Sequence, residues 1–128
     1  MASEEWGGGD WEQQAVLNAT ADDTVRTSVY DQVRGAPFPD GIADRVLRNT
    51  FNTAWDGRED DIAARQSELR QELEAGARRN DPTVVDISAS VVVGLIPRLE
   101  PAGAIVRRIV EDAERVLRER VYDGDQSG

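Results

Sequence analysis

Residues 101–122, PAGAIVRRIVEDAERVLRERVY, carry the strongest structural pattern in the chain. Apolar side chains recur there every three or four residues, which places them on one face of an α-helix. The pattern predicts a helix that begins at Glu100 or Pro101 and ends at Tyr122 or Asp123, before Gly124. The simplest role for this apolar face is in the protein core, and packing against another chain is the alternative. The face consists of Ile105, Val106, Ile109, Val110, Ala113, Val116, Leu117 and Val121.

Three segments upstream also favour helices. Asp10 is a plausible N-cap for a short helix over 11–21. Asp40 can cap a second helix, with one apolar stripe over 42–55. A third begins with Glu59, Asp60 and Asp61, whose charge suits a helix N-terminus, and its narrow apolar seam runs to Arg79.

Two further segments are compatible with either a helix or a strand. In 24–33, Val25, Val29 and Val33 fit both periods. In 83–96, β-branched residues alternate with polar ones, which is typical of a strand, but one helical side is also apolar. A helix is favoured for 83–96, because its only candidate strand partner within the chain is 24–33. We therefore predict a mainly α fold, a small bundle of four to five helices with extended termini.

The chain divides by composition into three parts. Residues 1–9 form an acidic, Gly-rich arm, predicted to be flexible because three consecutive glycines are costly to order. Residues 10–122 form a single helical domain, and 123–128 form a polar C-terminal tail.

The reactive side chains on which most enzymes depend are absent. Lysine, histidine and cysteine do not occur, and all 15 basic residues are arginines. A catalytic triad, a thiol nucleophile, a Schiff-base lysine and a His/Cys metal site are therefore excluded within this chain. We expect no catalytic, cofactor-binding or metal-binding residues, and no enzymatic activity.

Acidic side chains dominate the charge. With 25 acids against 15 arginines the net charge is −10, which opposes binding to nucleic acid or to an anionic membrane. No apolar run approaches the ~20 residues of a membrane span, and the acidic N-terminus is unlike a secretory signal. We expect a virion or cytoplasmic location, protein partners in a homo-oligomer within a larger assembly, and no small-molecule substrate.

Aromatic and arginine side chains are the best interface candidates, since both residue types anchor protein–protein contacts. Two tryptophans lie in or beside the N-terminal arm, and the others lie in 42–55 or on the exposed side of 58–79. The predicted interface residues are Trp6, Trp11, Phe51, Trp55, Arg65 and Arg70.

This acid-rich, lysine-free composition resembles that of proteins from extremely halophilic archaea and their viruses. A high-GC actinobacterial origin, which also favours arginine over lysine, is the rival interpretation. The resemblance implies a non-catalytic structural protein, such as a head–tail adaptor or connector of a haloarchaeal tailed virus, that acts through helix packing and tail docking. The alternative is an acidic regulatory module or chaperone that masks a basic partner.

Overall fold

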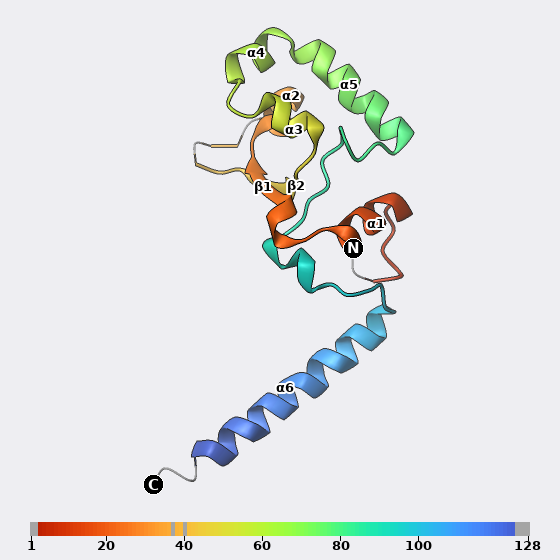
Figure 1. Cartoon of the computed structure of the whole chain (residues 1–128), viewed down its shortest axis with the longest axis vertical. Coiled ribbons are helices and arrows are strands. Elements are labelled where there is room, and N and C mark those ends of the chain that lie inside the picture. The colour runs from red at the N-terminus through yellow and green to blue at the C-terminus, as the bar shows by residue number, and fades with distance from the viewer. Residues whose placement is uncertain (1–2, 37, 40, 125–128) are drawn as a thin grey trace. The chain divides into compact units, whose positions relative to one another are not determined.

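A computed structural model describes residues 3–36, 38–39 and 41–124 (Figure 1). The chain is mainly α-helical, which confirms the predicted fold class. Its contacts divide it into two units, Gly8–Pro97 and a second unit of Met1–Gly7 with Arg98–Gly128. The helices are α1 (Asp10–Asn18), α2 (Val29–Arg34), α3 (Thr50–Trp55), α4 (Glu59–Ala64), α5 (Gln66–Arg79) and α6 (Ala102–Gly124). The 3₁₀ turns are η1 (Ala21–Asp23) and η2 (Val91–Leu95), and the strands are β1 (Thr24–Thr27) and β2 (Asp44–Leu47).

Most predicted helix boundaries lie close to the observed ones. The first helix ends at Asn18, a few residues early, and the acidic helix over 59–79 divides at Arg65 into α4 and α5. The ambiguous 24–33 segment contains both alternatives, because β1 is followed at once by α2. Helix α2 ends at Gly35, whose φ of 73° places it in the left-handed region that glycine tolerates.

The predicted helix over 42–55 is wrong in its first half. There β2 pairs antiparallel with β1, and Val46 lies opposite Val25. The spacing of Ile42 and Val46 fits a strand as well as a helix, and pairing between distant segments decides between them. The preference for a helix over 83–96 is also wrong, since only the 3₁₀ turn η2 forms there. Instead, 85–89 runs beside β2, and the backbone N–H of Leu47 donates to the carbonyl of Ile87 at 2.9 Å.

The core of the Gly8–Pro97 unit lies between the small sheet and helices α2 to α5. Tyr30 and Phe51 stack at its centre with ring centroids 5.7 Å apart. Close approach of 84–85 to α5 is possible because Gly76 has no side chain, and a Cβ there would lie 3.0 Å from Val84. The buried cluster consists of Val29, Tyr30, Val33, Val46, Phe51, Trp55, Ile62, Leu69 and Leu73.

Two asparagines connect this core to the surrounding chain. The Asn49 side chain accepts from the Asn52 backbone N–H at 2.9 Å and so caps α3. It also donates to the carbonyls of Pro82 and Val85 at 3.2 and 3.0 Å. The Tyr30 hydroxyl donates to Asn49 at 3.1 Å and accepts from Asn52 at 3.4 Å. One asparagine therefore joins α2, α3 and the 82–85 segment.

The buried tyrosine should make stability depend on pH under alkaline conditions. Burial raises the pKa of Tyr30 to about 12, above its usual value of about 10. Between these values the unfolded chain has already lost a proton that the folded chain keeps, so stability falls as pH rises. We expect a loss of about 2 kcal/mol in the free energy of unfolding between about pH 10 and pH 12, measured by urea denaturation.

The composition makes this measurement clean. Because lysine and cysteine are absent, the two tyrosines are the only side chains that titrate between about pH 9 and pH 12. The variant Tyr30→Phe should lose much less stability over this range than the wild type. Equal losses in the variant and the wild type would contradict a role for Tyr30.

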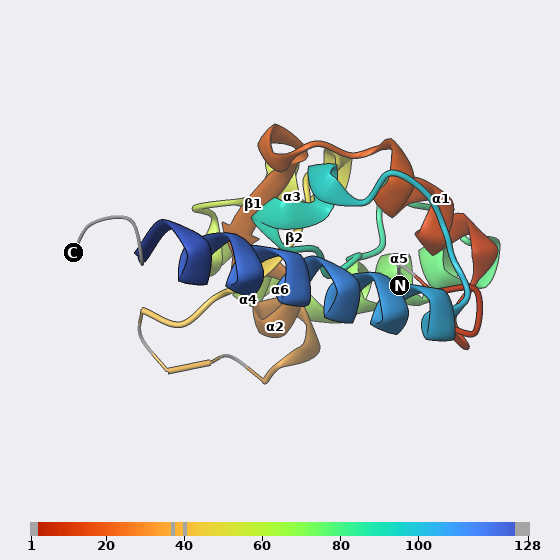
Figure 2. The same ribbon diagram turned by 90° about the horizontal axis from the view of Figure 1, so that it is seen from below.

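The second unit is built around α6, which is one unbroken helix of 23 residues (Figure 2). Glu4 and Glu5 bond the beginning of this helix. The backbone N–H of Ala102 donates to the Glu5 carboxylate at 2.8 Å, and that of Glu4 donates to the Glu100 carbonyl at 3.0 Å.

The flexibility of the 1–9 arm and the single domain over 10–122 stay predictions. Residues 1–2 of the arm and 125–128 of the predicted tail lie outside the described residues.

Candidate ligand-binding pocket

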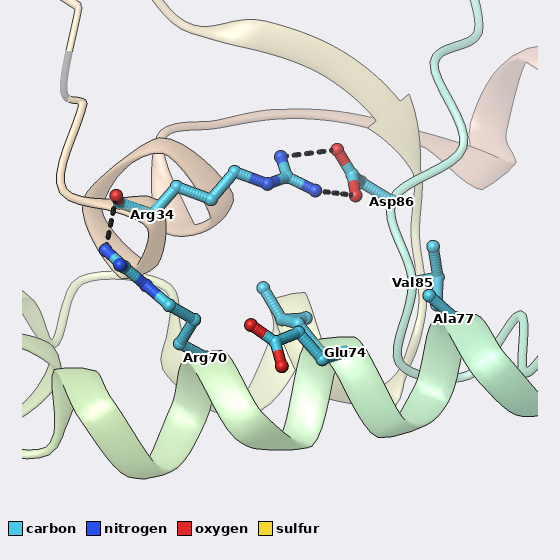
Figure 3. Close-up of a pocket in the computed structure, with 7 residues that line it drawn as sticks. Arg34, Arg70, Glu74, Ala77, Val85 and Asp86 are labelled. Atoms are coloured by element: carbon cyan, nitrogen blue, oxygen red, sulfur yellow. Dashed lines mark hydrogen bonds and ion pairs between the residues drawn. The ribbon is translucent and has the colours of Figure 1, made fainter.

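A pocket of about 370 Å³ opens between α2, α5 and the segment that follows α5 (Figure 3). It lies within the Gly8–Pro97 unit. Three stretches far apart in the sequence supply its walls, which combine an apolar floor with charged side chains at the rim. The lining residues are Arg34, Arg70, Leu73, Glu74, Ala77, Val85 and Asp86.

One wall of the pocket is a bidentate ion pair between Arg34 and Asp86. The Arg34 guanidinium, from the last turn of α2, donates to both oxygens of Asp86 at 2.8 and 2.5 Å. This hydrogen bonding raises the pKa of Arg34 above its ordinary value. The Asp86 side chain is only 18% exposed, so a partner of this geometry offsets the cost of desolvating its charge. Because each charge is matched by the other, this pair shapes the pocket without giving it a net charge.

Arg70 is the second cation of the pocket and is held differently. Its side chain extends from α5 toward the end of α2, where one nitrogen donates to the backbone carbonyl of Arg34 at 2.5 Å (Figure 3). This bond satisfies a carbonyl at the C-terminal end of α2 that has no partner within the helix. Among the residues that the structure describes, no carboxylate pairs with Arg70. Its remaining N–H groups are therefore the pocket's available donors.

The floor and the opposite rim follow from the packing of α5. Leu73 is 7% exposed and belongs to the core, and Ala77 and Val85 continue its apolar surface. Glu74 lies one turn from Arg70 on the same helix, and its only ion pair within the described range is a loose one with Arg78, at 3.9 Å. An anionic group near Arg70 and a short apolar body over Leu73 would match these two parts of the lining, whereas the Glu74 carboxylate would repel an anion placed beside it.

The predicted interface residues occupy different environments. Phe51 and Trp55 lie in the core, at 3% and 8% exposure. Arg65 covers one side of the Trp55 ring, with its guanidinium carbon 5.0 Å from the ring centroid. Trp6 and Trp11 are half-buried and lie in different units. The structure therefore does not gather the six residues on one surface, and only Arg70 lines the pocket. Whether any of them contacts a partner stays a prediction.

Sequence reasoning missed Arg34, Asp86 and Glu74. Asp86 offered the best signal, because it interrupts the apolar run of Val84, Val85 and Ile87. A charge in a segment that must be partly buried needs a partner. The identity of that partner depends on the tertiary fold and could not be obtained from local spacing.

No family model matches the chain, and no curated protein matches it closely. Solved structures do resemble it. FabK from Thermotoga maritima matches with a TM-score of 0.68 and 24% sequence identity, over 94% of this chain and 37% of FabK. A point mutant of FabK matches with a TM-score of 0.60 and 24% identity, over 94% and 34% of the two chains. The chain thus spans about a third of FabK, and the likeness shows a shared fold.

This finding overturns the predicted function. Because FabK is an enzyme, the prediction of a non-catalytic virion adaptor, with its alternative of a regulatory module or chaperone, is wrong, and so is the expectation of no enzymatic activity. The physical reason is that the absence of nucleophiles says nothing about binding pockets, which arginines, acids and apolar residues can form.

No helix in the described part of the chain has the length and hydropathy that membrane crossing requires.

Proposed function

We propose that this chain acts as the ligand-binding part of an enzyme, and that its pocket binds a small molecule with an anionic group and a short apolar body. The observation that carries the proposal is Arg70, a guanidinium at the rim of an apolar pocket that no described carboxylate neutralises. Arginine forms strong charge-assisted hydrogen bonds with carboxylates and phosphates. The likeness to FabK supports an enzymatic context for such binding.

The proposal also suits the reactive groups that are present. Charge, hydrogen bonds and shape, which the pocket's arginines, acids and apolar residues provide, do not require lysine, histidine or cysteine. In the pocket, Arg70 would hold the anionic group and Leu73 would contact the apolar body. The Arg34–Asp86 pair would fix the distance between α2 and the 84–86 segment.

We expect hexanoate, as a probe, to bind the pocket and to shift the amide NMR signals of Leu73, Ala77 and Val85. Hexanamide, which has the same body without the charge, should bind more weakly. Arg70→Ala should weaken hexanoate binding by roughly tenfold or more, because a charge-assisted hydrogen bond is lost.

The matched control is Arg79→Ala, which makes the same charge change on the same helix outside the pocket. It should leave hexanoate binding unchanged, and a hexanoate series with butyrate and octanoate measures the preferred body length. Equal weakening by both arginine variants would show that net charge, not the pocket, governs binding. The absence of any signal shift with all three acids would contradict the proposal itself.

A further inference from the structure

Helix α6 presents a wide apolar stripe to solvent. The exposed fractions are 60% for Val106, 60% for Ile109 and 64% for Leu117, with Val110 at 50% and Val116 at 42%. In the other segment of this unit, Glu4 and Glu5 bond the beginning of the helix, at Glu100 and Ala102. A continuous stripe of exposed apolar side chains such as this one marks an interaction site.

The stripe has the spacing of a helix that pairs with another helix. Ala102, Val106, Ile109, Ala113 and Val116 follow one another at alternating intervals of four and three residues. This is the seam of a two-helix interface in which side chains interdigitate. Val110 and Leu117 lie beside the seam and widen it. Alanine at position 113 allows a second helix to approach closely at the middle of the stripe.

The charges along α6 are distributed unevenly. Residues 98–110 contain three arginines and one acid, Glu100, which pairs with Arg98 and with Arg108, whereas residues 111–119 contain four acids and two arginines. The first half is thus positive and the second half negative. A parallel pair of such helices would place like charges side by side. An antiparallel pair places each positive half against a negative half, and the helix dipoles are then also favourably arranged.

From this pattern we propose that α6 binds α6 of a second copy of the chain, in an antiparallel pair. The seam fixes the register. Val106 faces Val116 of the second copy, and Ile109 faces Ala113 of the second copy. The two-fold axis passes near position 111, so that the two Val110 side chains lie close to each other. The surface joins two identical chains and is separate from the ligand pocket, which lies in the other unit.

Mass measurement of the full chain by analytical ultracentrifugation tests the pairing. The expected particle has twice the monomer mass of 14.1 kDa. Ile109→Gln, which places an amide in the seam, should weaken dimerisation by about tenfold or more. Glu111→Gln on the opposite face is the control and should leave the dimer intact. Helix content by circular dichroism at matched concentrations shows whether a variant has lost α6 rather than its partner.

Disulfide cross-linking tests the orientation, and the cysteine-free sequence makes single-cysteine variants unambiguous. Val110→Cys should form an intermolecular disulfide, because the two positions meet at the axis. Val116→Cys should not, because ten residues of helix separate it from its counterpart by about 15 Å in this register. Efficient cross-linking at position 116 would show a parallel pair and overturn the proposal. A monomer at all concentrations would also overturn it, as when α6 docks against exposed apolar residues of its own chain.

Discussion

We expect Phe51→Ala to lower the free energy of unfolding by about 3–4 kcal/mol. Phe51 is 3% exposed and stacks on Tyr30 at the centre of the buried cluster. Truncation removes the apolar burial of the ring and leaves a cavity between α2 and α3 that the surrounding helices cannot fill without moving. Urea denaturation followed by circular dichroism measures the loss.

A second phenylalanine provides the control. Phe38 is 50% exposed, so Phe38→Ala should change stability by about 0.5 kcal/mol or less. The comparison also decides the role of Phe51, which the sequence suggested as an interface residue. If Phe51→Ala kept the stability of the wild type and altered only its association, the core assignment would be wrong.

Asn49→Ala should destabilise the fold by about 3 kcal/mol. The substitution removes the α3 cap, the two bonds to the 82–85 backbone and the acceptor for the Tyr30 hydroxyl. Several groups at the edge of the core then lack partners, and the desolvation of each is no longer offset. Thermal and urea unfolding measure the effect.

The parts of this effect are separable. Asn49→Ser keeps an acceptor for the Asn52 amide, so it should recover about 1 kcal/mol, the usual worth of an N-cap. Asn18→Ala removes an exposed asparagine whose side chain accepts a hydrogen bond from Gln14 at 3.2 Å, and it should change stability little. An Asn49→Ala protein as stable as Asn18→Ala would mean that the bonds to 82–85 contribute nothing.

The spacing of residues along the chain was sufficient to predict the helices that have a periodic apolar pattern. The stripe of α6 and the acidic start of α4 contain the information that defines them, because residues three or four apart become neighbours on a helix. Phe51 and Trp55 were also identifiable as structurally important, although their choice between core and interface was not. Spacing along the chain reports which face a residue occupies, not what covers that face.

The parts that failed depend on contacts between distant segments. Val46 belongs to a strand because Val25 and the 85–89 segment lie beside it. The pocket requires Asp86 to meet Arg34 across 52 residues. The prediction of function failed for a related reason, since it was drawn from missing residue types, whereas a binding pocket depends on the placement of those present.

Helix α4 can detach from the core by local unfolding while the rest of the unit stays folded. Ile62 is the only one of its six residues that is buried in the described structure, whereas α5 anchors itself with Leu69 and Leu73. Arg58 and Arg65 flank the Trp55 ring, and their ion pairs are with exposed acids, while Arg58 also donates to the Ala54 carbonyl at 3.4 Å. Detaching α4 therefore gives up little apolar contact, so its amide hydrogens exchange with solvent through local fluctuation, while those of α5 remain protected until the whole unit unfolds.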